Sequence, residues 1–467
     1  MTILTDLATL LGPAQVLTGP DMTRYTGDWT THFTSAPLAV VRPGTTAEVA
    51  EVVKLAGRHG VPVIPSSGRT GLTGGSMTTG GLVVTTERLN RIRDLRPDTR
   101  IAIVEAGVIL QNLHQAAEAE GLYFPLWFGA RGSAMIGGVL STNAGGSNVL
   151  RYGSTRALCL GLEVVLPDGR VLDLMSELHK NNAGYDLRQL FIGAEGTLGI
   201  ITAAVMKLVP RPRAYATATL AARSLPDALT LLNRLQAASG GAVEAFEYMP
   251  GSYMQRLSEQ RPDIRLPFDR RYDTNILVEI GATAPRDSEP GPDGTIAVTA
   301  LLEQTLAQMI EDGAVLDAEI AQTEAQRLAM WKRRELAAEI TIARQPAIDT
   351  DIALPLDLVP EFYRRIHACL PALDPGCETL SVCHLGDGNV HFTVFPTREG
   401  LYDTVVEAVE DVVQDLRGSF SAEHGVGLSK LNTMARRKDP VALDVMRKIK
   451  SALDPDNLMN PGKVIPP

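Results

Sequence analysis

Short apolar runs and mixed polar segments alternate along the first half of the chain, in an order typical of interleaved strands and helices. Residues 46–59 predict a helix capped by Thr45 or Thr46, and a second helix is expected near residues 110–120. The runs that predict strands are residues 38–41, 61–64, 82–84, 101–105, 159–166, 170–173 and 200–209. Pro167-Asp168-Gly169 separates two of these runs and indicates a hairpin turn.

Two prolines within Pro210-Arg211-Pro212 end regular structure and predict a domain boundary. Beyond it the pattern predicts an α+β region with long gaps between its strands. The expected strands are residues 215–220, 242–249, 275–281 and 314–320, and the expected helices are residues 225–239, 297–311 and 323–343. Residues 283–295 are polar and rich in Pro and Gly, so we expect an exposed loop there. The tail from residue 439 predicts one helix and then an extended, Pro-rich end.

The composition of the 467 residues, 45% hydrophobic and 21% charged, is ordinary for a globular protein and excludes disordered, fibrous and membrane-bundle classes. The net charge of −10 disfavours nucleic acid as a partner. Four cysteines without CxxC spacing predict neither a disulfide framework nor a metal motif. No apolar run reaches the ~20 residues of a membrane span, and no basic residue precedes the first apolar run as in a signal peptide. We therefore expect a cytoplasmic protein.

Glycine accounts for 42 residues and is concentrated in five clusters. The clusters are residues 68–81, 129–146, 193–199, 386–388 and 425–427. The first follows a predicted strand, and its many free N–H groups would suit a pyrophosphate, although it is neither a GxGxxG turn nor a P-loop. Taken alone, each cluster is also explained by a tight turn. Three clusters within one α/β region predict a long cofactor that lies across several backbone turns.

Two histidines flank Asp387-Gly388, a strong two-residue turn signal. A turn centred there would place His384 directly opposite His391, with Cβ atoms ~5 Å apart, so that both could bind one metal ion. Glu423-His424 could supply further ligands. The alternative is that these are unrelated polar residues near turns.

Six ordered motifs together resemble the FAD-linked oxidase family of the vanillyl-alcohol-oxidase fold, in its D-2-hydroxy-acid dehydrogenase branch. The motifs are PSSGRTGLTGG, GARGSAMIGGVLSTNAGG, NNAGYDLRQLFIGAEGTLGIIT, HLGDGNVH, SAEHGVG and DPDNLMNPGK. The resemblance covers residues 35–463 and implies an α+β protein. It implies a two-subdomain, PCMH-type FAD-binding domain at residues 1–210 and a substrate (cap) domain with a metal site at 211–425. Residues 426–467 are then expected to return to the flavin.

Matching the motifs residue by residue implies which positions contact FAD. They are Ser67, Gly68, Arg69, Thr70, Gly71, Gly74, Gly75, Gly129, Ala130, Ser133, Gly137, Gly138, Asn143, Gly145, Glu195, Gly196, Ile200 and Asn460. The chain departs from the family at Ser67 and Arg69, where Gly and Asn are usual, and at Trp127, where Asp is usual. Relatives that bind FAD covalently carry a His in the first loop; since none is present here, we expect noncovalent FAD.

The resemblance also implies the chemistry. His384, His391 and Glu423 match the family's metal ligands, with zinc the expected divalent metal, and His424 matches its general base. Arg334, within a charge run that would otherwise be a solvated helix face, matches the Arg that binds the substrate carboxylate. Asn389 is a further catalytic candidate. Cys383, beside His384, is interpreted as a small buried residue.

These matches imply FAD-dependent oxidation of a D-2-hydroxy acid to the 2-oxo acid, with transfer of electrons to an electron-transfer flavoprotein, a quinone or a cytochrome. Relatives are often homodimers. The 2-hydroxyglutarate branch carries Thr and Lys where this chain has Ala338 and Asp349, so a short or aliphatic, lactate-like substrate is favoured. This preference fails if Lys332, Arg333 or Arg344 replaces the missing cation. The alternatives are a D-2-hydroxyglutarate dehydrogenase, a glycolate oxidase subunit, an O2-using oxidase of an alcohol, amine or sugar, and a non-catalytic flavoprotein.

Overall fold

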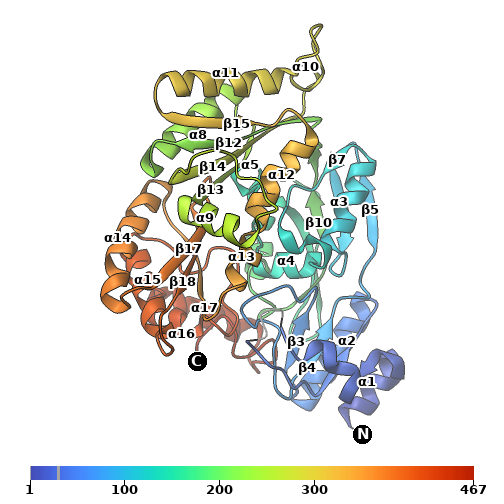
Figure 1. Ribbon diagram of the computed structural model, residues 1–467. Coiled ribbons are helices and arrows are strands. Elements are labelled where there is room, and N and C mark those ends of the chain that lie inside the picture. Colours follow the sequence, from blue (N-terminus) through green and yellow to red (C-terminus); the bar gives the residue numbers. More distant parts are fainter. Residues whose placement is uncertain (1, 29–31) are drawn as a thin grey trace. The chain divides into compact units, whose positions relative to one another are not determined.

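The computed structural model describes residues 2–28 and 32–467, which form two compact units (Figure 1). Unit 1 comprises Met1–Gly145, Ser154–Pro210 and Glu423–Pro467, and unit 2 comprises Gly146–Gly153 and Arg211–Ala422. The chain thus changes unit after Pro210, at the proline pair, and again after Ala422, three residues before the expected position. No helix in the described part of the chain is both long and apolar enough to cross a membrane.

Unit 1 contains a small sheet in which the first predicted strands pair in parallel. Its order is β1 (Val16–Leu17), β2 (Ala39–Val41), β4 (Leu82–Thr85) and β3 (Val63–Ser66). Helix α2 (Thr46–His59) connects β2 to β3, and the hydroxyl of Thr45 caps it by accepting the N–H of Glu48 at 3.1 Å. The apolar side of α2 packs on the buried sheet residues together with α1 (Ile3–Leu11).

A second sheet of unit 1 is antiparallel and contacts helix α4 (Ile136–Thr142) of the second glycine cluster. Its order is β5 (Ile92–Arg96), β6 (Ile101–Glu105), β10 (Ile200–Lys207), β8 (Cys159–Val165) and β9 (Val171–Leu174). The predicted hairpin at Pro167-Asp168-Gly169 is confirmed, since it joins β8 to β9. The other elements of unit 1 are α3 (Leu110–Ala119), β7 (Leu122–Tyr123), α6 (Thr155–Leu158), α7 (Arg188–Phe191), β11 (Val209–Pro210), α16 (Leu431–Arg437) and α17 (Pro440–Leu453).

Unit 2 is built on one seven-stranded antiparallel sheet. Its order is β15 (Val315–Ile320), β12 (Ala214–Ala222), β14 (Thr274–Ala282), β13 (Val243–Pro250), β17 (Glu378–His384), β18 (Asn389–Phe395) and β16 (Ile348–Ala353). The short helix α5 (Val149–Tyr152) belongs to this unit because Arg151 and Tyr152 both hydrogen-bond the buried carboxylate of Glu244 on β13.

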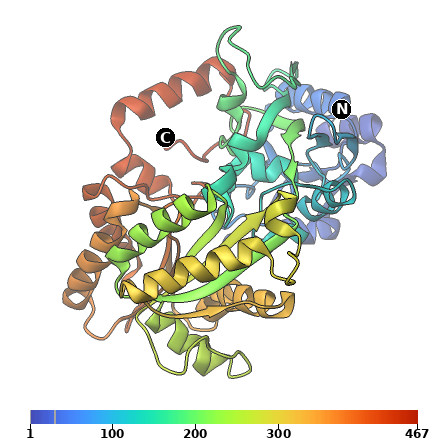
Figure 2. The same cartoon turned by 90° about the horizontal axis from the view of Figure 1, so that it is seen from above.

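Helices cover both faces of this sheet, and the two faces differ in character. One face carries the large apolar core under α8 (Leu225–Ser239), α11 (Ala297–Glu311), α14 (Val359–Leu373) and α15 (Tyr402–Asp415). Helices α8 and α11 run side by side on it (Figure 2). The other face packs on α9 (Gly251–Gln260), α12 (Glu324–Glu335) and α13 (Ala337–Ile342), and it holds a smaller apolar core. The expected mixed α/β architecture is confirmed.

One local expectation was wrong, and others were incomplete. The helix expected over residues 323–343 breaks at Leu336 into α12 and α13, whose residues Ala337 and Ile340 turn into the core with α9. The loop at 283–295 contains the one-turn helix α10 (Pro285–Ser288). Pro285 is its first residue, a position where the N–H that proline lacks would have no partner within the helix. Strand β16 and helices α9, α14 and α15 were not expected.

The register of the β17–β18 hairpin also differs from the expectation. His384 pairs with Asn389, and His391 pairs with Val382, because the turn contains four residues rather than two. The N–H groups of Asp387 and Gly388 both bond to the carbonyl of His384 and close this wider turn. A shift of two residues preserves the face on which a side chain lies, so both histidines still share one face, with ring centroids 5.4 Å apart.

Candidate active site

The first two glycine clusters pack directly against each other in unit 1. A Cβ on Gly68 would lie 2.2 Å from the carbonyl oxygen of Ser133, and one on Gly138 would lie 3.2 Å from the Cβ of Ser67. These glycines therefore allow two backbone loops to approach more closely than side chains would permit. Gly71, Gly129 and Ala130 lie on the exposed side of the same loops, where a ligand can reach their backbone.

The third cluster and the C-terminal tail join the first loop. Met459 pairs in parallel with Val63 beside β3, and Asn460 donates its N–H to the carbonyl of Val63 at 2.8 Å. The side-chain amide of Asn460 donates to the carbonyls of Gly75 and Glu195 at 2.9 and 2.8 Å. The structure thus brings the first three glycine clusters together with the C-terminal tail, although these segments span almost 400 positions of the sequence.

The conformation of these segments fits a dinucleotide. Four residues other than glycine adopt positive φ there, namely Arg69 (55°), Asn143 (52°), Glu195 (50°) and Asn460 (40°). Such strain concentrates at ligand sites, because the surrounding structure must hold it in place. The buried Oδ1 of Asn460 and the buried Oγ of Ser66 have no hydrogen-bond partner among the described residues. Buried polar atoms without a partner are uncommon in folded proteins and concentrate interest on these loops.

In unit 2, a buried cluster of charged side chains lies on the sheet face that packs on α12. Glu247 of β13 stands opposite His384 of β17 in the ladder, and its Oε1 lies 2.8 Å from Nδ1 of His384. Its Oε2 accepts a hydrogen bond from Nε of Arg334 at 2.7 Å. Burial acts to raise the pKa of Glu247, but the charges of His384 and Arg334 outweigh it and hold the pKa below its usual value.

This arrangement orients both partners of Glu247. In the neutral form of His384, Nδ1 would carry the proton because it faces a carboxylate, and Nε2 would be the side of the ring that can bind a metal. The guanidinium of Arg334 presents its Nη2 3.5 Å from that nitrogen. Arg334 is buried, so the charge run that contains it is not a solvated helix face at this position.

His391 lies next to a second buried carboxylate. Its Nδ1 is 3.8 Å from Oδ1 of Asp351 on the neighbouring strand β16. Asn389 donates its side-chain amide to Oδ1 of Asp351 and to the carbonyl of Ile352, at 2.8 and 3.1 Å. The contacts of Asn389 therefore orient Asp351. Cys383 points to the opposite face, into the large apolar core, and burial raises the pKa of its thiol.

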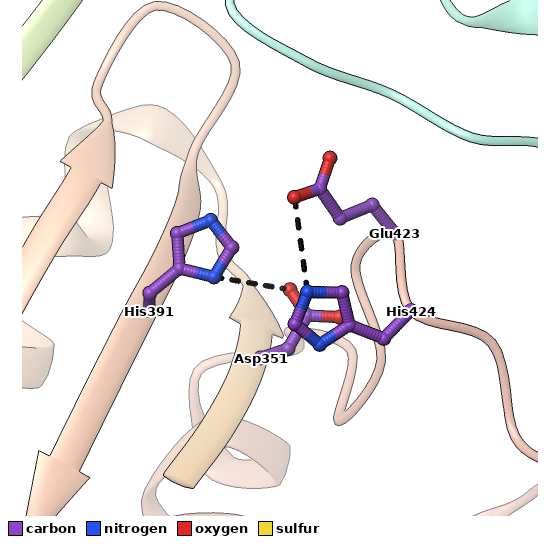
Figure 3. Close-up of side chains that lie close together, drawn as sticks. All are labelled: Asp351, His391, Glu423 and His424. Atoms are coloured by element: carbon purple, nitrogen blue, oxygen red, sulfur yellow. Dashed lines mark ion pairs between the residues drawn. The ribbon is translucent and has the colours of Figure 1, made fainter. Parts of the chain in front are cut away.

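The last residue of unit 2, Ala422, contacts Asp351 and directly precedes the predicted Glu-His pair. Ala422 donates its N–H to Oδ2 of Asp351 at 3.1 Å, and Glu423 and His424 follow it directly. Figure 3 shows Asp351, His391, Glu423 and His424 together, and one ligand atom from each lies within 4.8 Å of the others. His384 lies beside this group rather than within it.

The donor set of the four residues fits a divalent cation. The distances from His391 to Asp351 and from His424 to Glu423, 3.8 and 3.9 Å, are too long for hydrogen bonds. Two ligand atoms that each lie ~2.1 Å from one ion can be up to ~4.2 Å apart, so both pairs are within that limit. Two imidazoles and two carboxylates form the nitrogen–oxygen set that zinc and similar metals accept.

Two residues of this site were missed by the sequence reasoning. Asp351 belongs to the Asp-Thr-Asp run whose first member, Asp349, was considered for the substrate pocket. Because side chains alternate along a strand, Asp349 and Asp351 lie on the same face, and this spacing could have indicated Asp351. Glu247 had no local signal, because only the pairing of β13 with β17 brings it to His384.

Comparisons with known proteins identify the family of this chain. The FAD binding domain family matches residues 37–175, and the family of FAD linked oxidases, C-terminal domain, matches residues 211–464. A protein of Stutzerimonas stutzeri (strain A1501) named D-2-hydroxyglutarate dehydrogenase is 36% identical, covering 99% of this chain and 98% of its own length. A mitochondrial protein of the same name from Bos taurus is 34% identical, covering 99% of this chain and 83% of its own length.

Solved structures show the same fold at much lower identity. A p-cresol methylhydroxylase with bound substrate aligns with a TM-score of 0.74 at 15% identity, covering 99% of this chain and 96% of its own. A 4-ethylphenol oxidase from Gulosibacter chungangensis aligns at 0.73 and 18%, covering 100% and 97%. Because the family matches span both units and the relatives align over nearly the full length, this chain belongs to the family of FAD-linked oxidases.

Proposed function

We propose that the protein oxidises a D-2-hydroxy acid to the corresponding 2-oxo acid with noncovalent FAD and a divalent metal. The observation that carries this proposal is the buried Glu247–Arg334–His384 cluster, which places a cation for a carboxylate next to an imidazole that can bind a metal. When bound, FAD would supply the acceptor for the C2 hydrogen as hydride, and a divalent metal would supply the charge that polarises the substrate hydroxyl.

The side chains of the site would divide the remaining work. Arg334 binds the substrate carboxylate through its two Nη atoms, since its Nε is already committed to Glu247. His424 accepts the hydroxyl proton, a task for which an imidazole suits neutral pH. His391, Glu423 and Asp351 would hold the metal. His384, whose ring lies beside that of His391, is the further ligand expected from the sequence.

For the substrate, we propose D-2-hydroxyglutarate in place of the short-chain acid that the sequence favoured. Relatives of that name are 33 to 36% identical over most of the chain, and they favour this alternative. The argument against a dicarboxylate placed Asp349 in the pocket. Asp349 is exposed instead and accepts a hydrogen bond from Thr393 at 2.6 Å, so it does not repel a distal carboxylate there.

The distal carboxylate of D-2-hydroxyglutarate needs a cation, and three cations were considered from the sequence. Arg333 is paired with Glu319, and Arg344 is paired with Glu378, so two of the three cations considered from the sequence already have carboxylate partners. Lys332 is exposed on α12. Lys332→Ala would identify it as the distal-carboxylate residue if the KM for D-2-hydroxyglutarate rises while that for D-lactate stays constant.

The proposed reaction is tested by anaerobic mixing of the purified protein with D- and L-2-hydroxy acids while the flavin absorbance is followed. We expect bleaching by the D-acids and the highest kcat/KM for D-2-hydroxyglutarate over D-lactate and D-2-hydroxybutyrate. If no 2-hydroxy acid bleaches the flavin, the proposed reaction is wrong. If D-lactate exceeds D-2-hydroxyglutarate tenfold, only the substrate assignment is wrong.

The cofactor linkage has its own test. We expect a yellow protein that releases all its FAD when it is precipitated with acid, because no histidine or cysteine lies in the first loop. Flavin that stays on the precipitated chain would show a covalent bond. Peroxide formation under air would indicate that O2, rather than an acceptor protein or quinone, reoxidises the flavin.

A further inference from the structure

The side chain of Glu195 is directed to the loop that follows His424. Its Oε1 accepts the N–H of Val426 at 2.7 Å, and its Oε2 accepts the N–H of Gly427 at 2.9 Å. Gly425 makes this approach possible, since a Cβ there would lie 2.7 Å from Oε1 of Glu195. All these residues belong to unit 1. Glu195 was expected to contact FAD, but both of its carboxylate oxygens are engaged by this loop.

Thr73 of the first glycine cluster holds the same loop from a second side. Its carbonyl accepts the N–H of Leu428 at 2.7 Å, and its hydroxyl donates to the carbonyl of His424 at 3.4 Å. A Cβ on Gly427 would lie 2.2 Å from the carbonyl oxygen of Thr73. Gly425 and Gly427 also have positive φ, 80° and 49°, so the loop depends on glycine at both positions.

We propose that Glu195 is a positioning residue for His424. This inference rests on the proposed function, in which His424 is the general base. The carboxylate of Glu195 fixes the backbone two and three residues after His424, while its own backbone carbonyl accepts the side-chain amide of Asn460. One residue therefore ties the base to the loops expected to bind the dinucleotide, and the distance between base and flavin depends on it.

A carboxylate suits this role because it offers an acceptor oxygen to each of two N–H groups. A glutamine at position 195 has one oxygen and an NH2 group, which would face the second N–H as a donor. Glu195→Gln therefore preserves the size of the side chain but loses one contact and replaces it with repulsion. The expected consequence is a displaced His424, and a displacement of ~1 Å can slow an enzyme ~100-fold.

The test compares Glu195→Gln with Glu163→Gln in the full protein. Glu163 lies in the same unit and hydrogen-bonds Thr46 and Thr202, but it has no contact with the loop after His424 in the described structure. We expect E195Q to keep its FAD and metal and to lose ten- to hundredfold in kcat with little change in KM. The deuterium isotope effect with C2-deuterated substrate should rise, because a misplaced base makes the chemical step limiting. E163Q should match the wild type.

A double-mutant cycle decides whether the effect passes through His424. In the His424→Ala background, E195Q should cost less than twofold, because the base is already missing. Equal losses in both backgrounds, unchanged activity of E195Q, or loss of FAD in proportion to activity would each overturn the proposal.

Amide hydrogen exchange keeps the proposal testable if E195Q does not fold. In the wild type, the Val426 and Gly427 amides should exchange slowly, and in Glu195→Asp, whose shorter side chain cannot reach both, they should exchange at least tenfold faster. Fast exchange in the wild type would show that the clamp does not form. This readout needs no substrate, so a failure of the proposed reaction is distinguishable from a failure of the clamp.

Discussion

The two units present their functional groups in different ways. In unit 1 the expected cofactor site is mostly backbone, with N–H groups and carbonyls exposed by glycines and by four strained residues at positive φ. In unit 2 the candidate functional groups are side chains on one face of a sheet, namely the carboxylates of Glu247 and Asp351, the imidazoles of His384 and His391, and the guanidinium of Arg334. A backbone site leaves a continuous signature of glycines in the sequence. A side-chain site on antiparallel strands is scattered, because its members come from paired strands far apart in the chain.

The largest effect is expected from removal of an imidazole of the metal group. His391→Ala should lower kcat at least ~1,000-fold and reduce the bound metal, because a divalent ion would lose a nitrogen ligand and the hydroxyl its polarising charge. FAD content, measured by absorbance, should stay unchanged, since the expected flavin loops lie in unit 1. His367→Gln is the matched control, because His367 lies on α14, over the opposite face of the same sheet. Full activity in metal-free protein would exclude the metal mechanism.

The second-largest effect is expected at Glu247, whose carboxylate contacts both Arg334 and His384. Glu247→Gln should lower kcat/KM ~10- to 100-fold, as loss of a residue that orients a metal ligand does. Arg334 and His384 would both lose their anionic partner, so we expect a raised KM and weaker metal binding together. Steady-state kinetics and metal analysis measure the two. A change in only one of them would separate the roles of Oε1 and Oε2.

A third prediction concerns His114, a buried histidine of unit 1. His114 of unit 1 has a carbonyl rather than a carboxylate as partner, with Nε2 2.9 Å from the oxygen of Leu126, and burial lowers its pKa to about 4. Between pH ~6.5 and about 4 the unfolded chain therefore binds a proton that the folded chain does not, so stability falls as the pH falls. The loss reaches about 3 kcal/mol at most.

Thermal unfolding of wild type and His114→Gln across this pH range tests whether His114 causes this pH dependence. The variant keeps an N–H that can bond the carbonyl of Leu126 but cannot titrate, so its unfolding temperature should depend less on pH. Equal slopes for the two proteins would contradict the assignment.

The smallest expected effect tests the backbone character of the unit 1 site. A Cβ on Gly71 would meet no atom within 4 Å, so Gly71→Ala should leave the unfolding temperature unchanged. If FAD lies against this loop, the added methyl should still weaken FAD binding about tenfold, a cost of about 1.4 kcal/mol. Gly27→Ala, also with open space around its Cβ, is the control that should bind FAD normally. Equal FAD affinity in both variants would place the cofactor elsewhere.

The sequence predicted the regular elements well where local patterns were strong. Helix α2 with its Thr45 cap, the β8–β9 hairpin and helix α8 were found at or near their observed ends. Helix α14 and strand β16 were missed, although the buried residues of α14 recur at helical spacing: Val359, Phe362, Tyr363, Ile366 and Leu370. The break at Leu336 had no local signal, because burial rather than Gly or Pro directs α13 inward.

By itself, the sequence determined where the glycine loops lie, because φ freedom is a local property. The candidate catalytic and metal-binding residues were predicted from the family resemblance, without Asp351 and Glu247. Only the tertiary structure decided that Glu247 meets His384, that Asp351 joins His391, and that the carboxylate of Glu195 is directed to the loop after His424. Strand register and loop packing fix these contacts, and both depend on cores built from residues hundreds of positions apart. The β17–β18 hairpin shows this dependence most directly. Two extra turn residues changed the cross-strand partners of His384 and His391 but left both histidines on one face.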